Sequence, residues 1–564
     1  MNQSLFDEDD FQTTTQLVEP IILTFRQAAD PWHDWGLCEL HEALQIVASS
    51  ESRIQVGEAD TSGFSITANM THDEFVTALF HEMAANRRWN EVYPRFEEGK
   101  KIEGCAPKSV DGRRVEDRND KNDPKFVKEN WSSSGCEGNP PPQARNKCQR
   151  ITNVPLSSTG VGNLLDPNGG AKSLQAIIED AVEGNESDLK QETNPLTANH
   201  HSNGKVRGPY ASNSARVEKA LYVLSCYATS LSPWKPFVTS PPSDCTVYLP
   251  DNVPFDRALR LWKHLHNTAL RHPDEANGTM YRNLPLSGDG EAAQLLMLLD
   301  SLQSNLPAKR SSDDLNEDDI VELNNWLTIS FSSGTGVNVG GVHRIEVPGE
   351  VFHLLAPIEP PPNWKNRAAV SFVRDCLNGL RVSDATPQNN LARALLLPTS
   401  TDKWRAFESA TFFLYKNTDR ANTTNRRSAA LLPHFMTHFC KETKLMQEDQ
   451  LSACRKIGEL AGQTFNRDVT MISRLHNASS PDELRSNLAL LTFRLFKASN
   501  DADDRAGLYH ISPQEFQRVL DMTHGPDWAK AAQTISLFAC LKAFNKNIDS
   551  KGDNAAKANA GGTN

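Results

Sequence analysis

Few residues in this sequence combine types and spacing that could do chemistry. His81 and Glu82 begin like the helix of a zinc protease, in which a second histidine follows the first by four positions. Position 85 holds Ala85 instead, so the second metal ligand is missing. This pair therefore predicts no zinc site.

His33 and Asp34 form an adjacent His-Asp pair, as in metal-dependent phosphohydrolases. That chemistry needs further His and Asp ligands from later helices, and His72 and His81 follow at no recognisable spacing. We expect Asp34 to serve the turn and the start of the following helix. A metal-dependent phosphohydrolase stays a third functional alternative.

Cysteines and glycines give no firmer pattern. One set of residues could in principle bind zinc, although its spacing matches no known ligand pattern, namely Cys105, Cys136, Cys148 and either His200 or His201. The glycine-rich stretch 333–341 lacks a Gly-Lys-Ser motif and predicts a hairpin loop. No nucleophile elbow, readable carboxylate pair or dinucleotide fingerprint appears, so we predict a protein that is not an enzyme and has no cofactor.

Basic residues in the C-terminal part could follow a nucleic-acid backbone. Residues 401–545 hold 19 Lys and Arg against 16 Asp and Glu, whereas the whole chain has a net charge of −12. Several cations there stand between apolar positions, namely Arg455, Lys456, Arg467, Arg474, Arg494 and Lys497. They predict either a solvated helix face or a groove for a phosphate backbone.

The elements that would position these cations are amphipathic helices. From Trp404 to Asn545 apolar residues recur with a period near 3.6, which predicts a helical bundle. Ser480-Pro481 and Ser512-Pro513 each place an N-cap residue before a proline and early carboxylates. Gly525 and Pro526 introduce a further helix.

Composition bounds the class of protein. The chain has 564 residues, of which 38% are hydrophobic, so it is long enough for two or three domains. No apolar run is long enough to span a membrane, and the acidic N-terminus is not a signal peptide. Cysteines are scattered singly, which is typical of a reducing compartment. We therefore predict a cytoplasmic protein.

The fold class we predict is an α+β N-terminal body with irregular insertions, followed by an all-α C-terminal helical bundle. Residues 1–96 have the pattern of a compact β-α-β-β-α unit. We expect a polar, loop-rich insertion over 97–214 and a mixed α/β completion of the body over 215–400. The bundle follows over 401–545, and a disordered tail over 546–564. Within the body we expect helices at 216–230, 318–327 and 368–380.

Two stretches together resemble a known family. Asp30 to Leu40, which reads DPWHDWGLCEL, is similar to the NPF-x-D-x-G opening of large subunits of type I CRISPR Cascade complexes, with Asp30 and Trp32 in place of Asn and Phe. Residues 455–461, 489–498 and 512–544 resemble the bundle helices of that family, and the order of body and bundle agrees.

The resemblance implies a non-catalytic subunit of a crRNA-guided complex. Its body would read the protospacer-adjacent motif in duplex DNA and help to open the duplex, and its bundle would support the displaced strand. Its partners would be crRNA and target DNA, the backbone, crRNA-end-capping and small subunits of Cascade, and a helicase-nuclease or transposition proteins, with no membrane.

The family pattern leaves open which loops would read the motif. Motif reading needs a few polar or basic side chains on loops at a groove. Our hypothesis assigns this role to polar, basic loops, with Asn213 as the candidate for a base edge; its residues are Lys100, Lys101, Arg113, Arg114, Lys205, Arg207, Asn213 and Arg216. The alternative from another class is a protein-interaction scaffold, whose signature would be an exposed apolar patch on the bundle.

Overall fold

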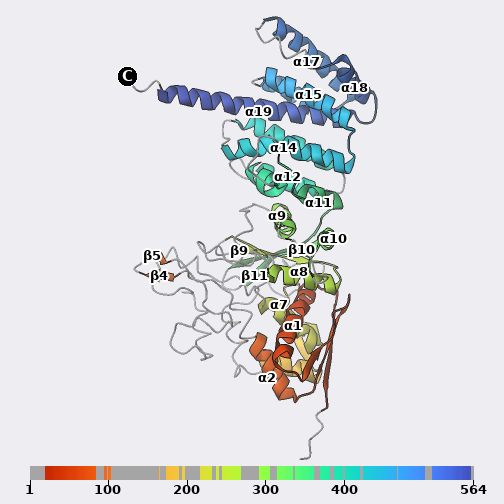
Figure 1. Ribbon diagram of the computed structural model, residues 1–564, viewed down its shortest axis with the longest axis vertical. Helices are drawn as coiled ribbons and strands as arrows, with labels where there is room; N and C mark the ends of the chain where they lie inside the picture. Colours follow the sequence, from red (N-terminus) through yellow and green to blue (C-terminus); the bar gives the residue numbers. More distant parts are fainter. Residues whose placement is uncertain are drawn as a thin grey trace, which may run out of the picture. The chain divides into compact units, whose positions relative to one another are not determined.

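The computed structural model (Figure 1) describes most of the folded chain. The described ranges are 19–83, 95–97, 100–102, 164, 173–189, 193–196, 216–231, 237–240, 244–267, 291–304, 306, 314–333, 337–360, 369–380, 386–397, 400–418, 423–466, 468–501 and 511–560. The internal contacts divide the chain into two units. Unit 1 comprises residues 1–235, 254–262 and 332–340, and unit 2 comprises 236–253, 263–331 and 341–564.

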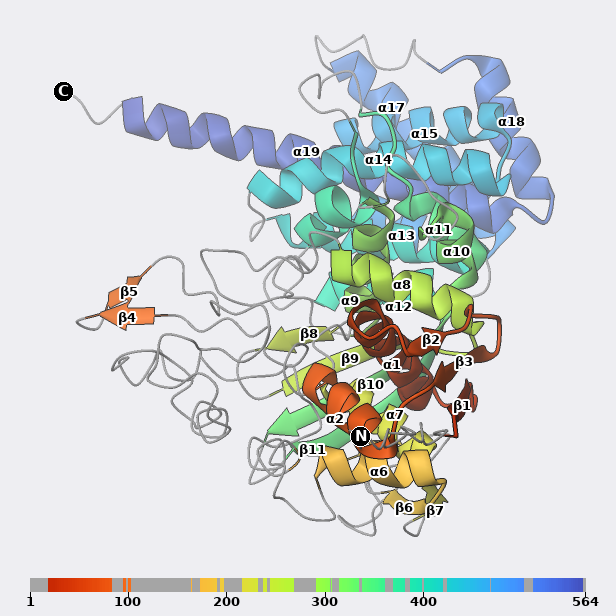
Figure 2. The same cartoon turned by 60° about the horizontal axis from the view of Figure 1, so that its bottom comes forward.

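Unit 1 begins with a small sheet and two helices. The strands are β1 (Ile21–Arg26), β2 (Ile54–Val56) and β3 (Gly63–Ala68), in the antiparallel order β1-β3-β2. The helices are α1 (Pro31–Ser50) and α2 (His72–Glu82). Every second side chain of β1 is buried, and ring contacts such as His41 to Phe64, 4.9 Å between centroids, pack α1 on the sheet (Figure 2).

A second group of elements also belongs to unit 1. It consists of α6 (Leu174–Glu183), β6 (Glu186–Leu189), β7 (Arg216–Lys219) and α7 (Ala220–Leu231). The helix predicted from residue 216 therefore begins four residues later, at Ala220. Residues 216–219 pair antiparallel with β6, which places Glu186 opposite Lys219. Pairing with a strand distant in sequence overrides the local helical pattern here.

Unit 2 contains a four-stranded sheet. Its strands are β8 (Phe237–Ser240), β9 (Asp244–Pro250), β10 (Asn325–Ser333) and β11 (Val337–Glu346). They are arranged in the order β11-β10-β9-β8. Residues 332–340, which include the end of β10 and the start of β11, belong to unit 1. The helices α9 (Glu291–Ser304) and α10 (Glu317–Glu322) belong to unit 2. Helix α8 (Phe255–Asn267) begins in unit 1 and ends in unit 2. The helix predicted to reach 327 ends at Glu322, because Trp326 and Leu327 are buried as part of β10.

Four short helices, two of which are not α-helical, follow this sheet in the sequence before the bundle. They are α11 (Gly349–Leu355), a π-helix (Phe372–Cys376), a 3-10 helix (Leu377–Leu380) and α12 (Thr386–Leu395). The single helix predicted over 368–380 is instead a π-helix followed by a 3-10 helix, and it begins at Phe372. Ser371 caps the π-helix by accepting a hydrogen bond from the Arg374 backbone, and it donates to buried Asp300. These contacts fix where the helical segment begins.

The bundle consists of seven helices in the described part of the chain. They are α13 (Ser400–Lys416), α14 (Thr423–Thr443), α15 (Glu448–Thr464), α16 (Val469–His476), α17 (Pro481–Asp501), α18 (Pro513–His524) and α19 (Trp528–Ala560). Figure 1 shows α14 and α15 on either side of α19, which also contacts α13 and α16. The predicted α+β body followed by an all-α bundle is thereby confirmed.

The predicted helix starts are also confirmed. Ser480 accepts a hydrogen bond from the Glu483 backbone at 3.2 Å, and Ser512 forms a reciprocal capping box with Glu515. Helix α19 extends to Ala560, through most of the segment for which composition predicts disorder. A helix that has already formed extends cheaply through residues such as Ala and Lys, because only the first turn is costly.

Two glycines allow α15 to approach α19 closely. A Cβ atom on Gly462 would overlap the carbonyl oxygen of Ala539, and one on Gly458 would lie 2.5 Å from the carbonyl oxygen of Ile535. The same device joins two helices of unit 1, where a Cβ atom on Gly36 would overlap the carbonyl oxygen of Ser225. These contacts hold the helices at separations that larger side chains would not permit.

Candidate nucleic-acid interface

The motif that resembles the Cascade opening is buried and joins α1 to α7. Asp30 caps α1, and its Oδ1 accepts hydrogen bonds from the backbone of Trp32 at 3.0 Å and of His33 at 3.3 Å. Its Oδ2 accepts from Asn194 at 2.7 Å and from the Tyr222 hydroxyl. A buried carboxylate with this many donors is well stabilised, so these residues organise the fold of unit 1.

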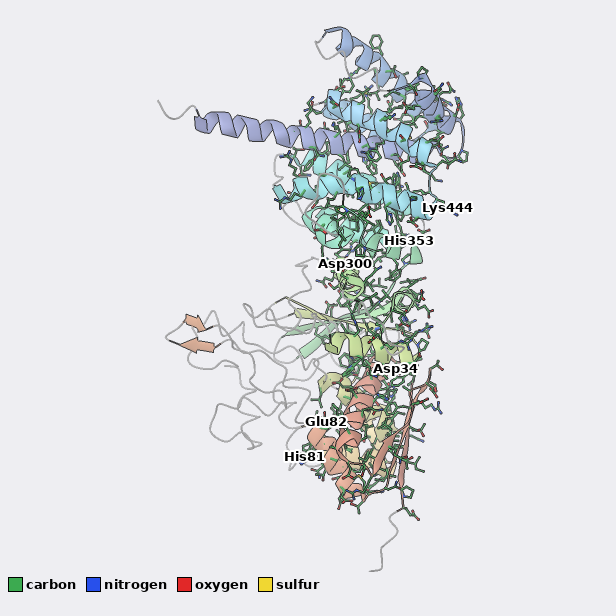
Figure 3. All side chains as sticks on the ribbon, viewed as in Figure 1. Asp34, His81, Glu82, Asp300, His353 and Lys444 are labelled. Carbon is green, nitrogen blue, oxygen red and sulfur yellow. The ribbon has the colours of Figure 1, made fainter. Side chains whose placement is uncertain are left out.

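Asp34 serves the turn before α1, as expected. Its Oδ1 accepts a hydrogen bond from the Ala28 backbone at 2.9 Å and lies 2.9 Å from His33 Nδ1. The His33 ring stacks on Tyr222 with centroids 4.4 Å apart. Figure 3 shows Asp34 on α1, well separated from His81 and Glu82 on α2. Across the described ranges, no group of three or more His, Cys, Asp or Glu side chains could hold a metal ion.

A buried polar cluster in the bundle lacks the geometry of a nucleophile and its base. Ser536 and His476 both contact the same oxygen of Glu408. Because serine donates to the carboxylate and not to the histidine, the arrangement has no activated hydroxyl. Burial, more than the neighbouring Glu408, raises the pKa of the Cys540 thiol well above its usual range, which keeps this thiol protonated.

The structure describes only part of the predicted motif-reading loops. Lys100 and Lys101 lie in β5 (Lys100–Ile102), which pairs with β4 (Arg95–Glu97), and Arg216 lies in β7. These three residues belong to strands, although their side chains lie outside the described part. The remaining residues of this set lie outside the described ranges, namely Arg113, Arg114, Lys205, Arg207 and Asn213.

Most described cations of the predicted bundle strip form ion pairs. Arg455 donates to Glu459 at 2.7 Å, and Lys456 pairs with Glu515. The Lys456 contact, followed by the Ser512 backbone, holds the pKa of Glu515 below its usual range. These pairs cancel much of the positive charge that Arg455 and Lys456 bring to this face of α15.

The cations on α16 and α17 are arranged differently. Arg494 of α17 pairs with Asp468, the N-cap of α16, at 2.6 Å. Arg474 is exposed on α16, and its backbone carbonyl accepts a hydrogen bond from Asn487 of α17 at 2.9 Å. Arg467 lies outside the described residues, and Lys497 lies in α17 with its side chain outside the described part.

A cationic corner forms where α15 ends and α16 begins. Lys546 of α19 donates to the Gln463 carbonyl at 2.8 Å, and Lys542 lies one turn earlier beside Gly462. Arg494 of α17 forms its ion pair with Asp468, the residue directly before α16. We call residues 462–466 and Asp468, with Arg494, Lys542 and Lys546, the α15–α16 corner. Asp468 neutralises Arg494, and Lys542 and Lys546 leave the described part of the corner with a net positive charge, so it can attract a phosphate backbone.

Two amide side chains hold this corner together. Asn466 donates to Asn547 Oδ1 at 2.6 Å, and Asn547 donates back to the Asn466 carbonyl at 2.9 Å. These bonds fasten the end of α15 to α19. Lys542 and Lys546 were missed in the sequence. Their spacing of four residues, which places two lysines on one side of a helix, was the available signal.

Comparisons with known proteins give no family. No family model matches this chain, and no curated protein matches it. Among the described residues, no helix combines the length and apolar character needed to cross a membrane.

Proposed function

We propose that this chain is a non-catalytic large subunit of a crRNA-guided DNA surveillance complex. Its bundle supports a displaced single strand along the α15–α16 corner. Its body reads a short DNA motif, helps to open the duplex and recruits the downstream helicase-nuclease or transposition proteins. The observation that carries the strand-supporting role is the gathering of Lys542, Lys546 and Arg494 around one helix junction.

The charge distribution supports this role. Single-stranded nucleic acid binds where a rigid surface presents cations that follow its backbone. Lys542 and Lys546 project from one helix that packs closely on α15, so their spacing is held by the bundle. The net charge of −12 for the whole chain limits non-specific binding to duplex DNA, and crRNA and the other Cascade subunits supply further affinity.

The motif-reading role is proposed for the loop residues named above. Basic and amide side chains read base edges by paired hydrogen bonds, each worth about 1–3 kcal/mol of discrimination. Joint substitution of Lys205, Arg207 and Asn213 by alanine is therefore expected to lower discrimination between target motifs in the assembled complex.

The salt dependence of single-strand binding tests the proposed corner. The full chain and Lys542→Gln/Lys546→Gln are titrated against a fluorescent single-stranded oligonucleotide at several salt concentrations. Each phosphate contact contributes roughly 0.7 to the slope of log affinity against log salt, so the double variant is expected to lose about 1.4. Lys441→Gln, an exposed lysine on α14, is the matched control and keeps the wild-type slope. An unchanged slope in the double variant would contradict the corner.

Co-purification tests the assembly. The tagged chain is isolated from cells that carry its neighbouring genes, and the bound RNA is sequenced. Uniform short RNAs with a repeat-derived end and stoichiometric partner proteins are expected. Clean protein without RNA would favour the second candidate.

The second candidate is a protein-interaction scaffold, and a groove between α12 and α13 favours it. The groove has a volume of about 380 Å³ and a mixed lining, in which Leu391, Leu397 and Phe413 are the large apolar side chains and Asp402 is a carboxylate. Leu397 is 45% exposed, and Arg405 lies at the groove as an exposed cation. A groove of this kind fits an amphipathic helix of a partner protein. Binding of a partner without RNA would support this reading.

A further inference from the structure

Strand β1 lies at one edge of the first sheet of unit 1, since the strand order there is β1-β3-β2 (Figure 2). The Gln27 backbone N–H donates to the Ser62 carbonyl at 2.8 Å, which continues the β1–β3 register by one pair. Antiparallel ladders bond every second residue of a strand. The residues of β1 that bond β3 are therefore Ile21, Leu23 and Phe25. The backbone groups of the residues between them point away from the sheet.

The residues with outward backbone groups are Ile22, Thr24 and Arg26. Within the described part of the chain, these outward N–H and C=O groups make no hydrogen bond. The same three side chains alternate with the buried ones and are exposed. Ile22 is a large apolar side chain that is 66% exposed. The edge of β1 thus presents unpaired backbone groups together with an uncovered apolar residue.

This edge is bounded at both ends. Pro20, directly before β1, has no N–H to donate. The Ala28 N–H, the next outward position after β1, already donates to Asp34 Oδ1 at 2.9 Å. A further strand can therefore bond three residues of β1 through both of their backbone groups. Edge strands of this kind pair with strands of other chains, and a short edge limits such pairing to well-matched partners.

We propose that β1 pairs antiparallel with β1 of a second copy of this chain, which joins two three-stranded sheets into one. A single antiparallel register places the three outward residues of one copy opposite those of the other. This register is centred on Thr24 and places Ile22 opposite Arg26 of the partner copy. Every outward N–H and C=O group of the three residues then has a partner in both copies. The dimer does not depend on the proposed nucleic-acid role.

The side chains of β1 fit this register. Thr24 lies on the two-fold axis opposite its own counterpart, and pairs of threonines across strands are favourable. The aliphatic part of Arg26 covers the exposed Ile22 of the partner copy. The guanidinium of Arg26 lies 3.9 Å from Asp60 in its own unit, so its charge has a counterion. The register therefore places no like charges directly opposite each other.

A second copy fits this edge better than a flexible segment of another protein. A flexible segment loses conformational entropy when it becomes extended, which weakens its binding. In each copy β1 is already held extended by its ladder with β3. Two-fold pairing also closes the edge, so a third chain finds no unpaired groups there. Because the contact is small, we expect an equilibrium between monomer and dimer and not a permanent dimer.

Sedimentation of the full chain over a series of concentrations tests the pairing. The mean mass of wild type is expected to rise from that of one chain towards that of two. Thr24→Pro removes an outward N–H and leaves the β1–β3 bonds in place, because edge strands accept proline where the N–H faces solvent. It is expected to weaken the dimer roughly 30-fold, since each copy loses one hydrogen bond.

The opposite edge of the same sheet supplies a matched control. Gly57 donates to the Ser65 carbonyl at 2.8 Å, so the neighbouring Val56 has outward backbone groups on β2. Val56→Pro is expected to dimerise like wild type. Circular dichroism checks that both proline variants are folded. Equal weakening of the dimer by both variants would assign the effect to the sheet as a whole and would overturn the β1 edge.

A charge exchange at Thr24 tests the register itself, because only a residue on the two-fold axis meets its own counterpart. Thr24→Lys and Thr24→Glu each place two like charges opposite each other, so each variant alone is expected to be monomeric. An equimolar mixture pairs a lysine with a glutamate and is expected to form the dimer again. A mixture that stays monomeric would overturn this register.

The remaining outcomes are also decisive. Wild type that is monomeric at every concentration would overturn the inference, and so would a dimer that Thr24→Pro leaves unchanged. If wild type is monomeric but co-purifies with a protein that Thr24→Pro loses, the edge binds a strand of another protein and not a second copy. The oligonucleotide titration of Lys542→Gln/Lys546→Gln reports on the proposed function separately, so failure of one proposal leaves the other intact.

Discussion

Asp300 is a buried carboxylate of unit 2. It lies on α9, accepts a hydrogen bond from Ser371 Oγ and pairs with Arg374 Nε at 3.1 Å. Burial raises its pKa to about 6, and Ser371 and Arg374 only partly oppose this while Asp375 adds to it. The folded chain therefore holds a proton on Asp300 at a pH where the unfolded chain has released it.

This shift predicts how stability depends on pH. Between about pH 4 and pH 6 the folded state binds more protons at Asp300 than the unfolded state does, so stability falls as pH rises. The free energy of unfolding of wild type, minus that of Asp300→Asn, is expected to fall by up to about 3 kcal/mol over this window. Urea unfolding at several pH values measures this difference. Asp318→Asn, an exposed carboxylate on α10, is the control, and the same trend there would contradict the assignment to Asp300.

Single residues show where reasoning from sequence succeeds and where it stops. The turn role of Asp34 could be predicted, because a carboxylate before a helix has few other local uses. The pair of Arg455 with Glu459 could also be predicted, because the two residues are four apart on one helix. The pair of Lys456 with Glu515 could not, because these residues are distant in sequence. Lys542 and Lys546 gain their importance from contacts with α15, which no local pattern records.

At the scale of elements, helix starts contribute measurable stability. Ser512 accepts a hydrogen bond from the Glu515 backbone at 3.2 Å, and Glu515 bonds back to the Ser512 backbone at 2.8 Å. Ser512→Ala removes the first of these bonds and is expected to lower the free energy of unfolding by about 1 kcal/mol. Ser512→Asp keeps an acceptor at the same place and is expected to stay close to wild type. Equal losses in both variants would show that the cap is not the cause.

The elements that could be predicted are the long periodic ones. Helices such as α15 and α19 bury one continuous stripe, and their period is visible in the sequence. Strand β7 was mistaken for helix because its partner β6 lies about 30 residues away along the chain. The end of α10 was missed for the same reason, since β10 gains its hydrogen bonds from the sheet and not from neighbouring residues.

At the scale of the whole molecule, the division into units does not follow the chain. Residues 254–262 and 332–340 belong to unit 1 although both segments are flanked by residues of unit 2. A linear division from composition cannot reveal this, because compact units are defined by contacts between distant segments. The five-part division predicted from the sequence stays a prediction, since much of 97–214 lies outside the described residues.

The two units are expected to respond separately to substitutions in their own cores. Gly36→Ala forces a Cβ atom into the Ser225 carbonyl of unit 1, and Gly462→Ala forces one into the Ala539 carbonyl of unit 2. Each is expected to lower stability by about 1–3 kcal/mol. Gly349→Ala is the control in unit 2, because a Cβ atom there meets nothing within 4 Å.

Calorimetry can decide whether the units unfold independently. Chains with several compact units often unfold in more than one transition. If each unit has its own core, Gly36→Ala lowers the temperature of one transition and Gly462→Ala lowers the temperature of the other, while Gly349→Ala moves neither. If both substitutions lower a single shared transition, the segments 254–262 and 332–340 couple the units into one cooperative body. That outcome would contradict independent unfolding. A destabilising substitution in unit 1 would then also lower the stability of unit 2, which contains the bundle.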